Sequence, residues 1–220
     1  MTHDLPILYS FRRCPYAMRA RLGLQYARIK YELREVVLRD KPPEMIAISP
    51  KATVPVLQVP NKSGKSLVID ESYAILKWAI SKNDPENWQK LIPQCDDLVR
   101  TNDDAFKAAL DKYKYASRFP EQTQGFYREQ GEFFLNQLDQ MLQQTPFLLG
   151  QKLTLADLAI LPFIRQFAHV DKAWFSAAPY PHLSRWLNNH LGSALFNNIM
   201  HKYAPWKPED HAVYGSDSHE

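Results

Sequence analysis

The chain has little cysteine, little glycine and no long hydrophobic run. Only two of its 220 residues are cysteines, Cys14 and Cys95, too few for the disulfide framework of a small secreted protein. The longest apolar stretch, Leu158 to Ile164, is far too short to span a bilayer. The first six residues carry neither the basic nor the apolar region of a signal peptide. These absences predict a cytoplasmic protein that does not enter the membrane.

Other shortages exclude other function classes. The seven glycines form no phosphate-binding loop, and the seven histidines show no metal-ligand spacing, so we expect no metal. Residues 1–80 hold 13 Lys and Arg against 7 Asp and Glu, whereas residues 81–220 hold 14 against 17. A basic first third attracts anionic ligands, or is simply a solvated surface. No basic run is interleaved with aromatic residues, so we expect no nucleic-acid partner.

Residues 6–81 alternate between strand-like and helix-like segments. Helical spacing of apolar residues predicts helices over 15–28 and from Ser72 onward. Strands are predicted at 7–9, 31–37, 56–59 and 66–69, the last two forming a hairpin through residues 60–65. The order β-α-β followed by β-β-α is typical of a small mixed sheet flanked by helices.

The strand signals stop after residues 83–93, which have the composition of a linker. Beyond them, apolar residues recur at helical spacing, and Thr154 to Asp157 forms a capping-box-like helix start. We therefore predict an α/β domain at residues 1–82 and an all-helical domain at residues 94–206. A polar, poorly ordered tail is expected at residues 207–220.

Cys14 lies between a predicted strand and a predicted helix, directly before Pro15. Unpaired N–H groups and the positive end of the helix dipole favour a thiolate at this position, and Arg12 and Arg13 add positive charge. A free thiol with a pKa of about 8.5 is only a few per cent ionised at pH 7, so a lowered pKa would make Cys14 far more reactive. The alternative is an inert, buried cysteine.

The segment around Cys14, residues 11–21, resembles the active-site segment of omega-type glutathione transferases and of glutaredoxins. Four further segments resemble omega-type transferases in the same order. They are the lysine loop at residues 38–42, the cis-proline segment at 53–57, the acidic-serine pair at 70–72 and the capping box at 154–157. The resemblance spans roughly residues 6–205 and implies a thioredoxin-like N-terminal domain followed by a helical domain.

The resemblance also implies a site for glutathione, with Cys14 as the catalytic residue. The backbone of Val54, beside a cis Pro55, would pair with the cysteinyl unit like an added strand. The other implied contacts are Ser72 with the γ-glutamyl carboxylate, Glu71 with the amine and Lys41 with the glycyl carboxylate, while Tyr16 shapes the site. Ser72 as a helix cap and Lys41 as a solvated side chain are the structural alternatives.

Some positions depart from the related families. Dithiol glutaredoxins carry a second cysteine where this chain has Ala17, so Cys14 lacks a local resolving partner, and Cys95 is expected to be a packed residue. Many glutathione transferases use a hydroxyl to hold glutathione itself as a thiolate. Tyr9 or Ser10 is the alternative for that role.

The acceptor pocket is expected to use aromatic residues. Aromatic residues at helical spacing can equally belong to the hydrophobic core. The candidates are Phe11, Tyr113, Tyr115, Trp174 and Trp206. The resemblance implies a glutathione-dependent, monothiol thioltransferase that acts on mixed disulfides or dehydroascorbate, and a homodimer. The alternatives are a Tyr- or Ser-type conjugating enzyme and a non-enzymatic binding scaffold of the same fold.

Overall fold

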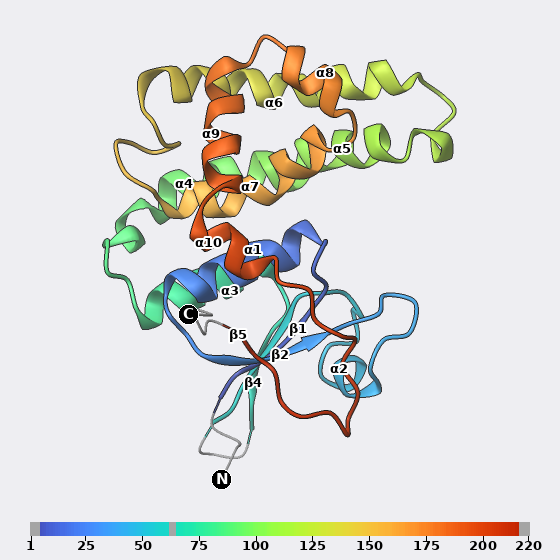
Figure 1. The fold of residues 1–220 in the computed structure, drawn as a ribbon, viewed down its shortest axis with the longest axis vertical. Coiled ribbons are helices and arrows are strands. Elements are labelled where there is room, and N and C mark those ends of the chain that lie inside the picture. Colours follow the sequence, from blue (N-terminus) through green and yellow to red (C-terminus); the bar gives the residue numbers. More distant parts are fainter. Residues whose placement is uncertain (1–4, 62–64, 216–220) are drawn as a thin grey trace. The chain divides into compact units, whose positions relative to one another are not determined.

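The computed structural model describes residues 5–61 and 65–215, which form two compact units (Figure 1). The first unit runs to Gln89 and resumes at Ser193, and the second spans Lys90–Gly192. The sequence predicted instead that the helical domain continues to residue 206. Residues 1–4, 62–64 and 216–220 lie outside the described residues, and with them part of the predicted hairpin turn and of the predicted tail.

The first unit is a five-stranded sheet with helices on both faces. Its elements are β1 (Ile7–Ser10), α1 (Pro15–Tyr26), β2 (Tyr31–Glu35), α2 (Pro43–Ile48), β3 (Val56–Val59), β4 (Leu67–Ile69), α3 (Ser72–Lys82), α10 (Ala194–Ile199) and β5 (Tyr214–Gly215). The strand order is β4-β3-β1-β2-β5, in which β1 and β2 are parallel and the other pairs antiparallel. The predicted thioredoxin-like α/β fold is confirmed.

Alternation along the strands sends successive side chains to opposite faces of this sheet. Leu8 joins the apolar cluster under α1 and α3, together with Leu57 of β3 and Ile75 of α3. Tyr9, the next residue of β1, joins the cluster on the other face, beside Met45 of α2. The sheet is therefore buried on both sides, and its strand ends carry the turns that hold the candidate site.

Helices α1 and α3 lie unusually close together. A Cβ atom on Gly23 of α1 would lie 2.9 Å from the Cα atom of Leu76 in α3, nearer than a side chain tolerates. Glycine at this position therefore allows the two backbones to approach each other. This contact holds α3, which begins at Ser72, close to α1, which Cys14 precedes.

The C-terminal segment also belongs to the first unit. Helix α10 packs against α1, and β5 pairs with the free edge of β2 through Tyr31–Gly215 and Glu32–Tyr214. The backbone N–H of Trp206 donates to the carbonyl of Glu35 at 2.9 Å. Within residues 207–215 the predicted poorly ordered tail is wrong, because this stretch ends in a paired strand.

The second unit is helical, as predicted. Its elements are η1 (Trp88–Leu91), which begins just before the unit, α4 (Ile92–Thr101), a π-helical stretch η2 (Asn102–Phe106), α5 (Lys107–Lys114), η3 (Ala116–Arg118), α6 (Gln124–Gln144), α7 (Leu155–Ala168), α8 (Lys172–Ala177) and α9 (Pro181–Leu191). Helix α7 is buried over most of its length. Its Phe167 stacks on Phe106 with a centroid separation of 5.4 Å.

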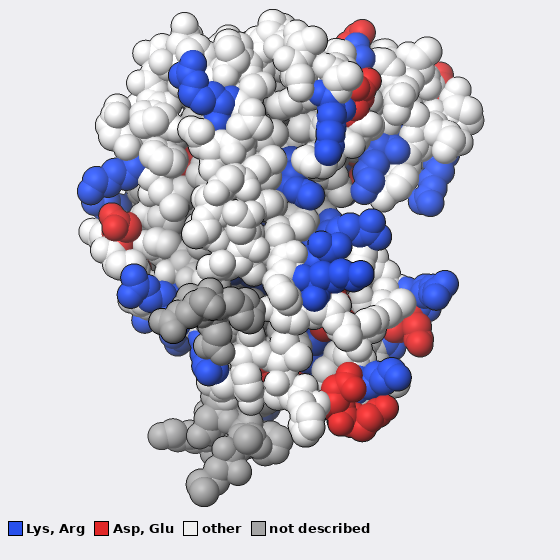
Figure 2. Space-filling model, viewed as in Figure 1, with Lys and Arg blue, Asp and Glu red and all other residues white. Residues whose placement is uncertain are grey.

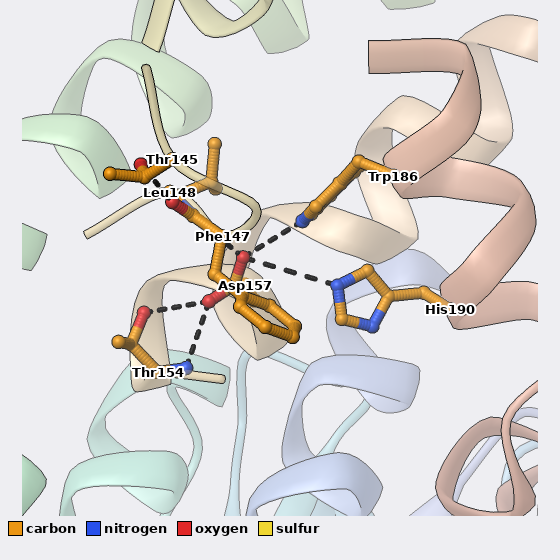
Figure 3. Close-up of polar contacts among 7 residues, drawn as sticks. All are labelled: Thr145, Phe147, Leu148, Thr154, Asp157, Trp186 and His190. Atoms are coloured by element: carbon orange, nitrogen blue, oxygen red, sulfur yellow. Dashed lines mark hydrogen bonds and ion pairs between the residues drawn. The ribbon is translucent and has the colours of Figure 1, made fainter. Parts of the chain in front are cut away.

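The predicted capping box is present at the start of α7 (Figure 3). The Asp157 carboxylate is fully buried, and its Oδ2 accepts from the N–H and the hydroxyl of Thr154 at 2.8 and 2.7 Å. Its Oδ1 accepts from the Leu148 N–H at 3.0 Å and from the Trp186 indole at 2.8 Å, and it lies 3.9 Å from His190 Nε2. One carboxylate thus joins the N-terminus of α7, the preceding loop and α9.

Candidate active site

Cys14 lies on the turn between β1 and α1, at the N-cap of the helix. Its extended backbone, with φ −74° and ψ 125°, is followed by Pro15 at the first helical position, where no N–H is needed. The side chain is half-buried and packs beside Phe11 on the cluster that contains Val36 and Val54. Its thiol donates to the Val54 carbonyl across 3.8 Å. Cys14 therefore lies, half-buried, at the positive end of a twelve-residue helix.

The Val54–Pro55 peptide bond, opposite Cys14, is cis, as the resemblance implied. The carbonyl of Val54 faces the Cys14 thiol. Among residues 5–61 and 65–215, nothing accepts a hydrogen bond from the Val54 N–H. This backbone group can therefore donate to a bound peptide.

Ser72 is the first residue of α3 and is buried, but it does not cap the helix. Glu71 is the N-cap residue, and no side chain caps α3. The Ser72 hydroxyl instead accepts from Arg19 Nη1 at 3.3 Å. The helix-cap interpretation of Ser72 is wrong, because its hydroxyl is held by a buried guanidinium of α1.

Glu71 and Lys41 lie on two separate turns of the first unit. The Glu71 carboxylate forms an exposed ion pair with Lys51, a partner that the sequence did not indicate. Lys41 is half-buried in the turn between β2 and α2, and no ion pair to it lies within the described part of the chain. Tyr16 is half-buried on α1, where the Arg19 guanidinium lies 5.8 Å from its ring centroid.

Sequence reasoning missed Arg21, which secures the turn that carries Cys14. Its guanidinium is buried and donates to the carbonyl of Arg12 at 2.7 Å, to the Ser10 hydroxyl and, through Nε, to the Ile199 carbonyl of α10 at 3.1 Å. Burial lowers the pKa of Arg21 from its usual value, although nearby acidic groups oppose this effect. The detectable signal was two arginines, Arg19 and Arg21, inside an otherwise apolar helix.

Tyr9 and Ser10, the alternative hydroxyls, are both buried and already bonded. The Tyr9 hydroxyl accepts from Arg34 Nη1 at 2.8 Å, and burial raises the pKa of this phenol. Ser10 Oγ accepts from Arg21. Both residues are buried, whereas Cys14 is only half-buried.

The aromatic acceptor candidates fall into two groups. Phe11 and Trp206 belong to the first unit, where Trp206 lies 6.2 Å from Tyr9, edge to face. Tyr113 and Trp174 pack on Phe167 inside the second unit. Tyr115 is exposed and Cys95 is fully buried. The sequence assigned Trp206 to the helical domain, and this assignment is wrong because residues from Ser193 onward pack on the sheet unit.

The described residues lack two further kinds of feature. No group of three or more potential metal ligands comes together within residues 5–61 and 65–215. In the same part of the chain, no helix has the length and apolar character needed to cross a membrane.

Comparison with known proteins agrees with this fold. Residues 8–88 match the glutathione S-transferase N-terminal domain model, and residues 127–189 match the C-terminal domain model. Maleylacetoacetate isomerase of Dictyostelium discoideum is 32% identical over 92 residues. That match covers 40% of this chain and only 39% of the isomerase, so the chain aligns with well under half of that relative.

Solved structures share the fold at low sequence identity. A glutathione transferase family member from Pseudomonas fluorescens, with two glutathione molecules bound, is 19% identical with a TM-score of 0.75, covering 90% of this chain and 92% of that one. A glutathione transferase from Phanerochaete chrysosporium in complex with oxidized glutathione is 17% identical with a TM-score of 0.77, covering 90% and 96%. The two domain models match in order and together span well over half of the sequence, so this chain belongs to the glutathione S-transferase superfamily.

Proposed function

We propose that this chain is a cysteine-type glutathione transferase that works as a monothiol thioltransferase. The observation that carries the proposal is the position of Cys14. Its half-exposed thiol lies at the N-terminus of α1, opposite the carbonyl of Val54 and one turn before Ala17. A cysteine in this setting is an activated nucleophile, and with no neighbouring cysteine it depends on an external thiol to complete a cycle.

The glutathione tripeptide would lie along the strand ends of the first unit. Val54 offers an unbonded N–H to its cysteinyl unit, in the manner of an added strand. The uncapped start of α3 and the Ser72 hydroxyl suit the γ-glutamyl carboxylate. Glu71 is proposed for the amine and Lys41 for the glycyl carboxylate, and the first of these roles requires Glu71 to release or share Lys51.

The proposed reaction consists of two successive thiol–disulfide exchanges. The Cys14 thiolate attacks the glutathionyl sulfur of a mixed disulfide, and the other thiol leaves and takes up a proton. A second glutathione thiolate then attacks the glutathionyl sulfur held on Cys14. Oxidised glutathione departs, and the Cys14 thiolate is restored. The buried positive charge of Arg21 lies near enough to Cys14 to favour the thiolate in both steps.

Mass spectrometry and alkylation test this function together. After incubation with oxidised glutathione, we expect a single glutathione adduct on Cys14, and Cys14→Ser should abolish both the adduct and thioltransferase activity. Iodoacetamide should modify Cys14 at a pH well below that needed for an ordinary cysteine, whereas Cys95, which is fully buried, serves as the internal control. Unchanged activity in Cys14→Ser would overturn the proposal.

A second candidate rests on the isomerase from Dictyostelium discoideum. Its identity of 32% over 92 residues favours an isomerase, whose reaction involves no disulfide exchange at Cys14. Under that function Cys14→Ser would keep its activity, because no bond to Cys14 forms. The same variant therefore separates the two candidates.

We also propose that the enzyme is a cytoplasmic homodimer. The support for the dimer is the resemblance to cysteine-type glutathione transferases, and the support for the compartment is the absence of a cysteine framework. Light scattering at several concentrations would test the dimer, and a mass equal to one 25.6 kDa chain throughout would exclude it.

A further inference from the structure

A cavity of about 630 Å³ opens within the first unit, beside the turn that carries Cys14. Phe11 and Val36 line one part of it, and Tyr203 and Pro205 of the C-terminal segment line another. All these residues belong to the first unit. The volume lies in the range typical of sites for small organic ligands, about 300–1,000 Å³.

The cavity carries an excess of positive charge. Arg12, Arg13, Arg39 and Lys202 line it, and Glu35 is the only acidic residue among the lining residues described. Figure 2 shows Lys and Arg side chains over the start of α1 and over the segment that follows β2. We call this feature the basic cavity.

None of these four cations forms an ion pair within the described chain. Across residues 5–61 and 65–215, no carboxylate lies within ion-pairing distance of the side chains of Arg12, Arg13, Arg39 or Lys202. Glu35 offsets this charge only in part: its carboxylate accepts from the Arg12 backbone N–H at 2.8 Å and interacts with the Arg12 charge, but burial raises its pKa. Cations that converge on a cavity without a partner favour an anionic ligand.

The basic cavity is separate from the proposed glutathione contacts but adjoins Cys14. Val54, Ser72, Glu71 and Lys41 do not line it. Phe11 does, and it packs beside Cys14 on the same apolar cluster. A group bonded to the glutathionyl sulfur can therefore reach the cavity when that sulfur lies at Cys14.

We propose that the basic cavity binds the carboxylate of an anionic acceptor, so that the preferred substrates are mixed disulfides of glutathione with small acidic thiols. This inference rests on the proposed thioltransferase function. The Cys14 thiolate attacks the glutathionyl sulfur, the acidic thiol leaves as the disulfide bond breaks, and a second glutathione removes the first as oxidised glutathione. The carboxylate stays ionised throughout and serves only for binding.

Two matched substrates test the inference. The mixed disulfide of glutathione with mercaptopropionate carries a carboxylate where that with mercaptoethanol carries a hydroxyl. We expect kcat/KM at low salt to be at least about threefold higher for the acidic substrate, and high salt should reduce this preference because exposed charges are screened. An acidic substrate that is reduced no faster than the neutral one would overturn the inference while leaving the proposed function standing.

Variants connect that preference to the cavity. Lys202→Gln and Arg39→Gln should each lower the ratio of the two kcat/KM values by about two- to fivefold, the effect of one partly exposed ion pair. Lys152→Gln, which removes the same charge from an exposed site in the second unit, should leave the ratio unchanged. If the KM for glutathione rises instead in the cavity variants, the cavity holds glutathione's own carboxylate and the inference is wrong.

A binding measurement keeps the inference testable without catalysis. Thiodipropionate has two carboxylates and a thioether, so it cannot exchange with Cys14. Calorimetry should detect its binding to the full chain and weaker binding to Lys202→Gln, even if neither mixed disulfide is a substrate and the proposed function has failed. No detectable binding, or equal binding to both proteins, would overturn the anion site.

Discussion

A single guanidinium sets the direction of the Ser72 hydroxyl. Arginine has only donors, so Ser72 Oγ must accept from Arg19, and its own proton is left to donate outward. A ligand carboxylate needs such a donor. Arg19 is therefore a positioning residue for the proposed γ-glutamyl contact. It is fully buried and would act on the ligand only through Ser72.

The Ser72→Ala variant separates binding from stability. Removing the hydroxyl deletes a buried hydrogen bond from Arg19, which should cost about 1 kcal/mol in the free energy of unfolding. The KM for glutathione should rise about tenfold or more, because a hydrogen bond to a charged group is lost. Denaturant unfolding and steady-state kinetics measure the two effects.

Ser72→Thr is the matched control, since it keeps the hydroxyl. Its KM for glutathione should stay close to that of the native protein. If Ser72→Ala loses stability but keeps its KM, Ser72 is a structural residue and the proposed carboxylate site fails.

Arg21 is a second buried arginine, and it donates hydrogen bonds to the turn that carries Cys14. Arg21→Met leaves the carbonyls of Arg12 and Ile199 and the Ser10 hydroxyl without their donor, so the free energy of unfolding should fall by at least about 3 kcal/mol. Arg100→Met, at an exposed position of α4, breaks only a surface ion pair and should cost about 0.5 kcal/mol. Equal losses in the two variants, measured by denaturant unfolding, would contradict the role assigned to Arg21.

Among the elements, the start of α7 concentrates the polar contacts of the helical unit. Burial lowers the pKa of His190 from its usual value, and the neighbouring Asp157 carboxylate only partly opposes this effect. The unfolded chain therefore takes up a proton at a higher pH than the folded protein does. The stability that His190 contributes is present above its unfolded pKa and declines as the pH falls through about 6.5.

His190→Phe should weaken this acid dependence of the unfolding free energy, as followed by denaturant unfolding across that pH range. Phe147→Leu changes the ring that lies 5.9 Å from His190 but keeps the imidazole, so the acid dependence should persist in that variant. An acid dependence that is undiminished in His190→Phe would show that other groups control it.

The elements of the sheet unit were predictable because their patterns are local. Periodicity predicted α1 and β2 to within a few residues, and Thr154 with Asp157 predicted the capping box. The role of Arg21 was not predictable in this way, since its acceptor at Ile199 lies far along the chain. The partner of Glu71 was missed for the same reason, because Lys51 meets it only through the fold of the β3–β4 edge.

Local patterns also misassigned the C-terminal segment. Polar composition predicted a loose tail after residue 206, yet Trp206 stacks 4.2 Å from the Arg34 guanidinium. The Val213 carbonyl accepts from the Leu33 N–H at 2.7 Å. Strand pairing and a cation–π contact hold this segment in place. Neither interaction requires apolar residues at regular spacing, so the sequence shows no pattern that would predict them.

On the scale of the whole molecule, the sheet unit is built from both ends of the chain. Ending the chain after Met200 would remove Trp206 and β5 and leave the edge of β2 unpaired. We expect this truncation to lower the free energy of unfolding by about 2–4 kcal/mol and to promote association through the exposed edge. Denaturant unfolding and size-exclusion chromatography measure these effects, and unchanged values in both would show that the segment adds nothing to the unit.

The return of the chain to its first unit has a consequence for synthesis on the ribosome. Arg21 emerges early, but its acceptor on α10 and the strand that covers β2 are translated more than 170 residues later. Until then the Arg21 guanidinium of a nascent chain lacks its acceptor on α10, and the edge of β2 is not paired with β5. The Cys14 turn thus reaches its final form only after the helical unit has been made, so the N-terminal half alone cannot complete this turn during synthesis.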